Sequence, residues 1–241
     1  SAAFSPDNRL QFRSYCGGVP KIPNPFRYKF SWSPLGVLKA LKSPSKSIQN
    51  GEVMDTSAPW DALSSYEALL PDGAETFEVY PNRDSLPFME DYGFEAGWPV
   101  DQFVRGTLRL NGWAEAWNEI FKTVGDMSPE ELAALSARLE AENLYEDGEP
   151  DRVVLCVDLQ AQRDGADVWS KSYVLDAAGD ATHTAMARLV SVPVSFAVEA
   201  VLNGEIAPGV SAAPSDPVMA RDWLAKLKAK GEPMEMVDRL A

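Results

Sequence analysis

Hydrophobic and polar residues alternate in several stretches of the chain, a pattern typical of β-strands that are buried on one face. The clearest stretch is 100–110, where Val104 and Leu108 fall on the face opposite Arg105 and Thr107. The same pattern predicts strands at 10–15, at 26–32, in a stretch that ends at Tyr80, at 151–162 and at 168–175, the last two joined into a hairpin by a turn at Gly165.

Two of these stretches have unusual composition. Gly17-Gly18 follows the first strand and is predicted to end it, leaving a loop whose backbone another group can approach closely. Aromatic residues occupy alternate positions of the second strand, which predicts one face made wholly of rings: Phe26, Tyr28, Phe30 and Trp32. The stretch 45–75 is polar and is predicted to be irregular.

Hydrophobic residues spaced three and four positions apart predict helices with one buried face. Ser33-Pro34 and Ser128-Pro129 are predicted helix starts, because serine caps a helix and proline suits its first turn. Pro193 lies inside the most apolar helix and predicts a kink or a division there. The predicted helices are 33–43, a short helix capped by Asp84 or Ser85, 113–124, 128–139, 182–202 and 216–230.

Strands and helices mix along the chain without strict alternation. This order favours an α+β fold, with a mainly antiparallel or mixed sheet covered by helices, over a doubly wound parallel sheet. We predict one domain over 1–241, with a helical sub-region at about 113–147 and a C-terminal helix at about 216–230.

Composition and charge exclude several classes of partner. Of the 241 residues, 45% are hydrophobic, a fraction typical of a folded chain. The formal net charge of −14 opposes binding to nucleic acids and to anionic membranes. No stretch approaches 18 uninterrupted apolar residues and the N-terminus lacks the apolar core of a signal peptide, so we expect a cytoplasmic protein without a membrane partner.

The scarcity of histidine and cysteine excludes further kinds of site. One histidine, His183, and two distant cysteines, Cys16 and Cys156, exclude His-rich metal sites and most histidine-based triads. We expect both cysteines to be buried small residues and His183 to lie at a helix start without a catalytic role. Neither GxGxxG nor GxxxxGK[ST] occurs, so any segment that grips a nucleotide would lie elsewhere.

Arg83 is the first candidate for a functional side chain. It follows the strand that ends at Tyr80 and precedes the short helix, and functional residues are common at such corners. The residue pattern alone leaves open that Arg83 forms only a surface pair with Asp84.

Five strings of residues, in order along the chain, resemble the C-terminal domain of the saccharopine dehydrogenase family. They are SYCGGVPKIPNPFRYKFSWSPLG at 14–36, YPNRDSLPFMEDYG at 80–93, RGTLRLNGW at 105–113, TAMAR at 184–188 and LNGEIAPGV at 202–210. The resemblance implies a domain of the glyceraldehyde-3-phosphate-dehydrogenase-like type, which binds substrate and supports a homodimer. It also implies that NAD or NADP is held by an N-terminal Rossmann domain that this chain lacks, so the chain alone is expected to be inactive.

The resemblance implies a reaction and a set of substrate-binding residues. Saccharopine, which carries three carboxylates, is oxidised at the carbon beside its secondary amine, and hydrolysis of the resulting imine gives glutamate and aminoadipate semialdehyde in lysine metabolism. Arginine suits such carboxylates because its planar fork binds them with two hydrogen bonds. The expected site comprises Arg83 and Arg105, the backbone N–H groups of Gly17 and Gly18, Trp32 as a shield against water, and Asn82 and Thr107 beside the two arginines.

Other functions stay open at this point. Leu35 stands where relatives often carry a charged residue, which concerns the choice of substrate. A second alternative keeps the fold and changes the substrate, as in a lysine 6-dehydrogenase or an oxidoreductase of carboxylated polyamines. A third alternative is a module that binds a ligand or forms a dimer without catalysis.

Overall fold

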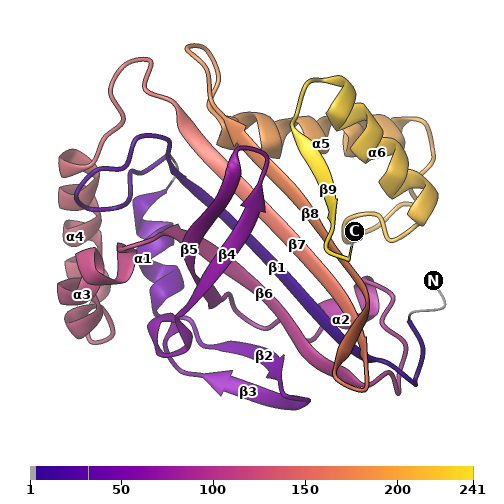
Figure 1. Ribbon diagram of the computed structural model, residues 1–241. Helices are drawn as coiled ribbons and strands as arrows, with labels where there is room; N and C mark the ends of the chain where they lie inside the picture. Colours follow the sequence, from indigo (N-terminus) through magenta and orange to yellow (C-terminus); the bar gives the residue numbers. More distant parts are fainter. Residues whose placement is uncertain (1–3, 32, 241) are drawn as a thin grey trace.

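A computed structural model describes residues 4–31 and 33–240. One mixed sheet of nine strands runs through the molecule in the order β3-β2-β6-β1-β7-β8-β9, and β5 joins β6 to β4 (Figure 1). Among the strand pairs of the described residues, β1 with β6 is parallel and the others are antiparallel. The strands are β1 Arg9–Pro20, β2 Ser45–Gln49, β3 Glu52–Thr56, β4 Ser64–Leu70, β5 Gly73–Pro81, β6 Val100–Leu110, β7 Asp151–Arg163, β8 Ala166–Ala178 and β9 Met234–Asp238.

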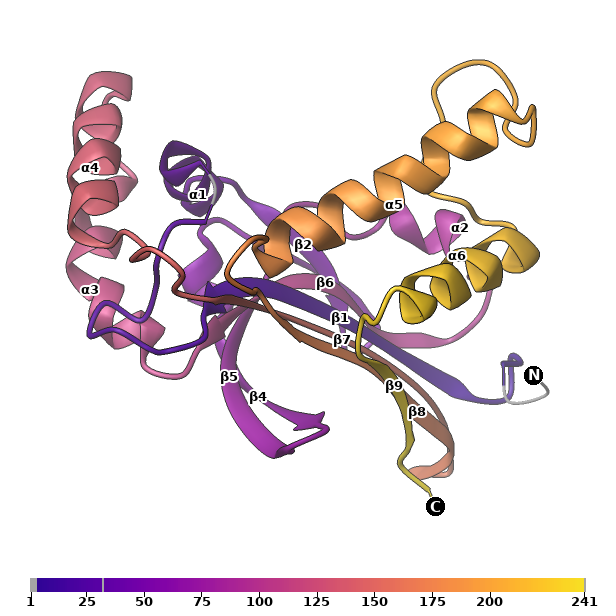
Figure 2. The ribbon, with the colours of Figure 1, turned by 90° about the horizontal axis from the view of Figure 1, so that it is seen from above.

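Helices lie on one face of the sheet, and the β4–β5 hairpin curls beneath the other face (Figure 2). The helices are α1 Pro34–Leu41, α2 Phe88–Asp91, α3 Trp113–Val124, α4 Pro129–Glu142, α5 Ala185–Leu202 and α6 Pro217–Ala229, with a 3-10 turn at Pro59–Ala62. This arrangement confirms the predicted α+β class with a mixed sheet.

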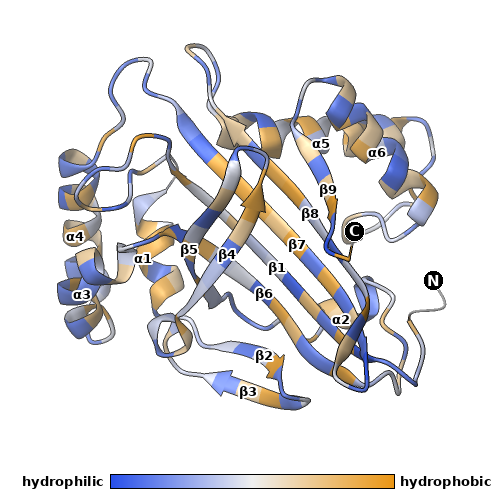
Figure 3. Ribbon diagram, in the orientation of Figure 1, coloured by the Kyte–Doolittle hydropathy of each residue, from blue (hydrophilic) through white to orange (hydrophobic). Residues whose placement is uncertain are grey.

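One hydrophobic core cluster lies between the hairpin and the central strands, and a second packs α1, α3 and α4 around Trp113 and Trp117. Tyr66 and Phe77 from the hairpin pack with Tyr15, Leu108 and Val154 from β1, β6 and β7. Figure 3 shows hydrophobic and hydrophilic segments alternating along the long strands, as expected for strands with two different faces. The predicted strands at 100–110, 151–162 and 168–175 are therefore confirmed.

The predicted aromatic strand at 26–32 is wrong. The described part of this stretch is irregular, and Arg27 has a left-handed φ of 56°. Phe26 and Tyr28 converge on the indole of Trp117 in α3, with ring centroids 4.7 Å and 5.7 Å away. The alternation of rings thus reflects packing against one helix rather than pairing within a sheet.

The glycine pair Gly17-Gly18 does not end the first strand, as predicted, because β7 pairs with β1 along its whole length. Gly17 lies opposite Val154, and Gly18 lies opposite Val153. A Cβ atom on Gly17 would overlap the carbonyl oxygen of Leu108 in β6. Gly17 therefore allows β1 and β6 to approach each other closely within the sheet.

The stretch 45–75 is not irregular, as predicted, but contains β2, β3 and β4. Asn50 and Gly51, with φ values of 53° and 76°, form the tight turn between β2 and β3. This Asn-Gly pair is itself a hairpin signal. The alternation of hydrophobic and polar residues did not predict this hairpin, because β3 is exposed along most of its length and so lacks a buried hydrophobic face. The edge strand β9 was not predicted either.

Most predicted helices are present near their predicted positions. Ser33 caps α1, and Ser128 with Glu131 forms a complete capping box at the start of α4. The short helix α2 begins at Phe88, later than predicted, and Asp84 instead accepts a hydrogen bond from the Leu86 N–H at 2.9 Å.

Helix α5 contains Pro193 and runs on as a single element from Ala185 to Leu202, so it is not divided there. Its N-terminus is capped by the buried Asp151 carboxylate, which accepts from the N–H groups of Ala185 and Met186 at 2.6 Å and 2.9 Å. It is the one described helix that is long and apolar enough to cross a membrane, by length and composition only, and 17% of it is buried. Here Arg188 and Glu199 tie it to the fold through Glu232 and Lys226.

Candidate functional site

Neighbouring strands β1 and β6 form the floor of a small pocket. Their parallel register places Ser14 beside Arg105 and Cys16 beside Thr107. Because side chains on alternate residues share a face, these four lie on one side of the sheet. The pocket has a volume of about 150 Å³ and is lined by Ser14, Cys16, Asn82, Arg105, Gly106 and Thr107. The structure thus brings together three predicted site residues, namely Asn82, Arg105 and Thr107.

Arg105 is held at its backbone and carries an unpaired charge. Its N–H donates to the Ser85 hydroxyl at 3.0 Å, and its carbonyl accepts from the Asn82 N–H at 2.9 Å. The guanidinium carbon lies 3.5 Å from the centroid of the Phe88 ring. No carboxylate pairs with Arg105 among residues 4–31 and 33–240. A stacked guanidinium keeps its hydrogen-bonding edge free for an anion.

Arg83 lies at the predicted corner between β5 and α2, outside this pocket. It is exposed and has a left-handed φ of 56°. Its carbonyl accepts from the Lys46 N–H at 3.0 Å, which ties the corner to β2. The alternative of a surface pair with Asp84 is not seen in the described part of the chain, since Asp84 accepts from Leu86 instead.

The remaining predicted site residues do not line the pocket. Gly17 faces the other side of the sheet, toward Leu108. Gly18 faces the helices, where a Cβ atom would overlap the methyl group of Met186. Trp32 lies outside the described residues. A role of these three residues in binding stays a prediction.

Cys16 is exposed rather than buried, contrary to prediction, because it lies on the floor of the pocket. The surrounding protein raises the pKa of its thiol, and the nearby Arg109 guanidinium opposes this rise. Cys156 is buried in the core as predicted, and burial raises the pKa of its thiol to about 12. His183 is exposed before α5, in agreement with a position at the helix start.

We predict that iodoacetamide alkylates Cys16 slowly at pH 7, with a rate that still rises above pH 9. The thiolate is the reactive form, and a raised pKa moves its formation above the ordinary value of about 8.5. Mass spectrometry of the folded chain over a pH series measures this rate. The Cys16→Ser variant is the control, because any alkylation that remains in it occurs at Cys156. A rate that levels off below pH 8 would contradict the prediction.

Arg109 is a buried cation close to Cys16 that the sequence reasoning missed. It is 8% exposed and is the one arginine or lysine buried among the described residues. Aromatic rings surround its guanidinium carbon, with centroids 4.9 Å away for Tyr28, 5.7 Å for Tyr80 and 5.5 Å for Trp113. The strand pattern of 100–110 contained a signal for it, because alternation places Arg109 on the face of Arg105 and Thr107.

The electrostatics keep Arg109 charged. Burial by itself lowers the pKa of Arg109, but Tyr80 and Tyr28 raise it, and the net pKa lies above its ordinary value. Its Nε atom has no hydrogen-bond partner in the described part of the chain, and Nη1 donates to the Leu108 carbonyl at 3.4 Å. An unsatisfied buried donor costs about 1–3 kcal/mol, and more when it is charged.

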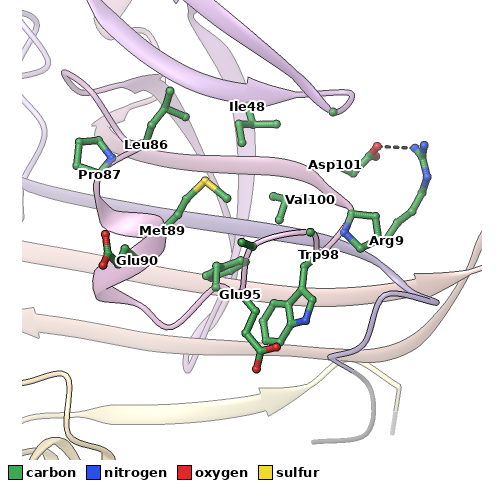
Figure 4. A pocket seen from close by; sticks show the side chains of 15 residues that line it. Arg9, Ile48, Leu86, Pro87, Met89, Glu90, Glu95, Trp98, Val100 and Asp101 are labelled. Carbon is green, nitrogen blue, oxygen red and sulfur yellow. Dashed lines mark hydrogen bonds and ion pairs between the residues drawn. The ribbon is translucent and has the colours of Figure 1, made fainter.

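A larger pocket fits a polyanion poorly. It has a volume of about 810 Å³ and lies between the start of β1, the loop before β6 and α2 (Figure 4). Its one arginine, Arg9, is already paired with Asp101 at 2.5 Å. Glu90 and Glu95 also line it and would repel carboxylates. The described residues contain no cluster of metal-ligating side chains.

Known proteins resemble this chain in both sequence and fold. A family profile described as the saccharopine dehydrogenase C-terminal domain matches residues 4–232. The L-glutamate-forming, NADP(+) saccharopine dehydrogenase of Saccharomyces cerevisiae is 30% identical over 291 residues, covering 91% of this chain and 64% of that enzyme. The mitochondrial alpha-aminoadipic semialdehyde synthase of Mus musculus is 39% identical over 112 residues, covering 45% of this chain and 12% of that protein.

The fold agrees with these matches. The apo structure of the L-Glu-forming saccharopine dehydrogenase from Saccharomyces cerevisiae superposes with a TM-score of 0.75 at 26% identity, covering 97% of this chain and 68% of that chain. In the sequence comparisons, this chain spans less than two-thirds of the length of each of these two relatives. The resemblance drawn from the five strings of residues is confirmed.

Proposed function

Because this chain belongs to the saccharopine dehydrogenase family through its C-terminal domain, we propose that it is the substrate-binding and dimerisation domain of such an enzyme. The parent enzyme oxidises saccharopine by transferring a hydride to NAD or NADP, and water then hydrolyses the resulting imine to glutamate and aminoadipate semialdehyde. The fungal relative is named as NADP(+)-dependent. The proposal includes a homodimer in the cytoplasm, with the Rossmann domain of the parent as the second partner.

The observation that carries the proposal is the state of Arg105. In a chain of net charge −14, a guanidinium without an acidic partner is held over Phe88 at the mouth of a pocket. An anionic substrate must be bound by such local cations, since the overall field opposes it. Arg105 would bind one substrate carboxylate, and Thr107 and Asn82 would offer it further hydrogen bonds.

This chain provides the substrate side of the site and not the cofactor side. Its sequence lacks the glycine-rich fingerprint that holds a dinucleotide pyrophosphate at a helix N-terminus. NAD or NADP, bound by the Rossmann domain, would accept the hydride. The residues of this chain would bind and orient the carboxylates so that the reacting carbon faces that domain.

The test is reduction of NAD and NADP by the longest natural chain that contains this sequence, with saccharopine and lysine as alternative substrates. Turnover with saccharopine alone supports the proposal. Turnover with lysine would instead favour a lysine 6-dehydrogenase, and no turnover with either would favour a carboxylated polyamine substrate or a binding module.

We predict that Arg105→Ala raises KM for saccharopine about 10- to 100-fold, because a charge-assisted pair with a carboxylate is lost. Arg105→Lys should recover part of this loss. Arg138→Ala, which removes an exposed arginine on α4, is the matched control and should leave KM unchanged. Steady-state kinetics at saturating cofactor measures the effect, and equal KM values for Arg105→Ala and Arg138→Ala would refute a binding role.

A further inference from the structure

We propose that Phe88 is a positioning residue, which holds the Arg105 guanidinium in the orientation that receives a substrate carboxylate. The inference rests on the proposed function for the identity of the ligand but not for the positioning itself. The guanidinium carbon lies 3.5 Å from the centroid of the Phe88 ring, the shortest such distance among the described residues. A carbon atom at contact distance leaves no room for an edge-on guanidinium, so the two planes lie flat on each other.

The segment that carries Phe88 also holds the backbone of Arg105. The Asn82 N–H donates to the Arg105 carbonyl at 2.9 Å, and the Ser85 hydroxyl accepts from the Arg105 N–H at 3.0 Å. Ser85 is fully buried, and its own N–H donates to the Lys46 carbonyl at 2.9 Å. The segment 82–88 is thus anchored to β2 and fixes both the backbone and the guanidinium of one residue.

A row of rings connects Phe88 to the sheet. The Tyr92 ring lies one helical turn further along α2, with its centroid 5.9 Å from that of Phe88. Tyr92 in turn lies 5.4 Å from Phe12 of β1 and 6.2 Å from Phe103 of β6. Packing therefore restrains the Phe88 ring, and the ring restrains the guanidinium of Arg105.

A ring orients a guanidinium without neutralising it. Two other arginines of this chain are held by carboxylates, with Arg152 2.7 Å from Asp176 and Arg188 2.9 Å from Glu232. Such a partner would occupy the N–H groups that a substrate needs. A free arginine side chain, by contrast, loses conformational entropy when it binds a ligand. Phe88 removes part of that freedom beforehand and leaves the N–H edge open.

The first test is Phe88→Leu in the longest natural chain. It should raise KM for saccharopine about threefold to tenfold and leave kcat within about twofold, because orientation is lost in the ground state and the transition state alike. Phe88→Tyr keeps the ring and should retain the original KM. Phe94→Leu is the matched control, because this neighbouring ring packs on Phe12 and Phe103. An unchanged KM in Phe88→Leu, or an equal rise in Phe94→Leu, would overturn the proposal.

A double-mutant cycle separates positioning from a structural role. In the Arg105→Ala background, Phe88→Leu should raise KM by less than about twofold, because the ring acts through a guanidinium that is no longer present. If the ring only stabilised the fold or contacted the substrate directly, its loss would still raise KM in that background. Such a result would refute the positioning role.

A labelling measurement separates failure of the positioning role from failure of the proposed function. Phenylglyoxal reacts with arginine side chains, and mass spectrometry of the digested chain follows each arginine separately. Phe88→Leu should make the labelling of Arg105 several times faster, because the ring no longer covers the guanidinium. Arg138, exposed on α4, is the internal reference and should react equally in both chains.

The outcomes differ for the two ideas. Faster labelling of Arg105 in Phe88→Leu, together with no turnover of saccharopine, would support the positioning role and count against the proposed substrate. Equal labelling of Arg105 in the two chains would overturn the positioning role, whatever the substrate.

Discussion

Gly17→Ala is expected to lower the free energy of unfolding by about 3 kcal/mol or more, enough to unfold a marginal domain. A Cβ atom at this position would overlap the carbonyl oxygen of Leu108, which is a backbone atom of β6. Neither strand can move aside easily, because β1 is also paired with β7 along its whole length. The expected result is a large decrease in the urea midpoint, followed by tryptophan fluorescence or circular dichroism.

Gly18→Ala is the matched control for this prediction. Its Cβ atom would meet only the terminal methyl group of Met186, a flexible side chain that can turn away. We therefore expect a loss of about 1 kcal/mol or less at Gly18. Gly18→Ala combined with Met186→Ala should remove the overlap altogether. Equal losses at Gly17 and Gly18 would contradict the role of the Leu108 backbone.

Asp158→Ala is expected to destabilise the domain by about 3–5 kcal/mol, because it leaves the hydroxyl groups of Tyr66 and Ser172 without their acceptor and Arg239 without its carboxylate. Asp158 is 2% exposed and lies on the side of the sheet opposite the pocket. It accepts hydrogen bonds from Tyr66 at 2.9 Å and from Ser172 at 2.5 Å. Arg239, at 3.2 Å, links the C-terminal end of the chain to the same carboxylate.

Urea denaturation measures this loss, and two further variants assign it. Tyr66→Phe removes one hydrogen bond and should cost about 1 kcal/mol. Asp164→Asn changes an exposed aspartate in the β7–β8 turn and should leave stability nearly unchanged. A loss below about 1 kcal/mol for Asp158→Ala would contradict a network that depends on the buried charge.

Long patterned elements could be predicted from the sequence because their signals are local. Helix α4 begins with a serine cap, a proline and a glutamate, all within four residues. The β7–β8 hairpin follows from alternation over two neighbouring stretches and a glycine turn. The five strings of residues also identified the family, because they include residue types that packing does not require.

The aromatic residues of 26–32 show where local reasoning fails. Their alternation matched a strand, but Phe26 and Tyr28 meet Trp117, which lies about 90 positions later in the chain. The start of α3 also depends on a residue distant in sequence. The carboxylate of Glu78 in β5 accepts hydrogen bonds from the N–H groups of Gly112 and Ala114. Contacts of this kind form only in the folded chain, and no local sequence pattern predicts them.

The candidate site divides in the same way. By itself the sequence determined most of the helices and the long strands β6, β7 and β8, that Arg105 and Thr107 share one face of a strand, and that the chain belongs with saccharopine dehydrogenases. Only the tertiary structure decided that β1 lies parallel to β6, which opens Cys16 to the pocket and sets Arg83 outside it. It also decided that Arg109 is buried among rings without an acidic partner. Alternation along a strand depends on residues two positions apart, whereas burial and pairing depend on groups that only folding brings together.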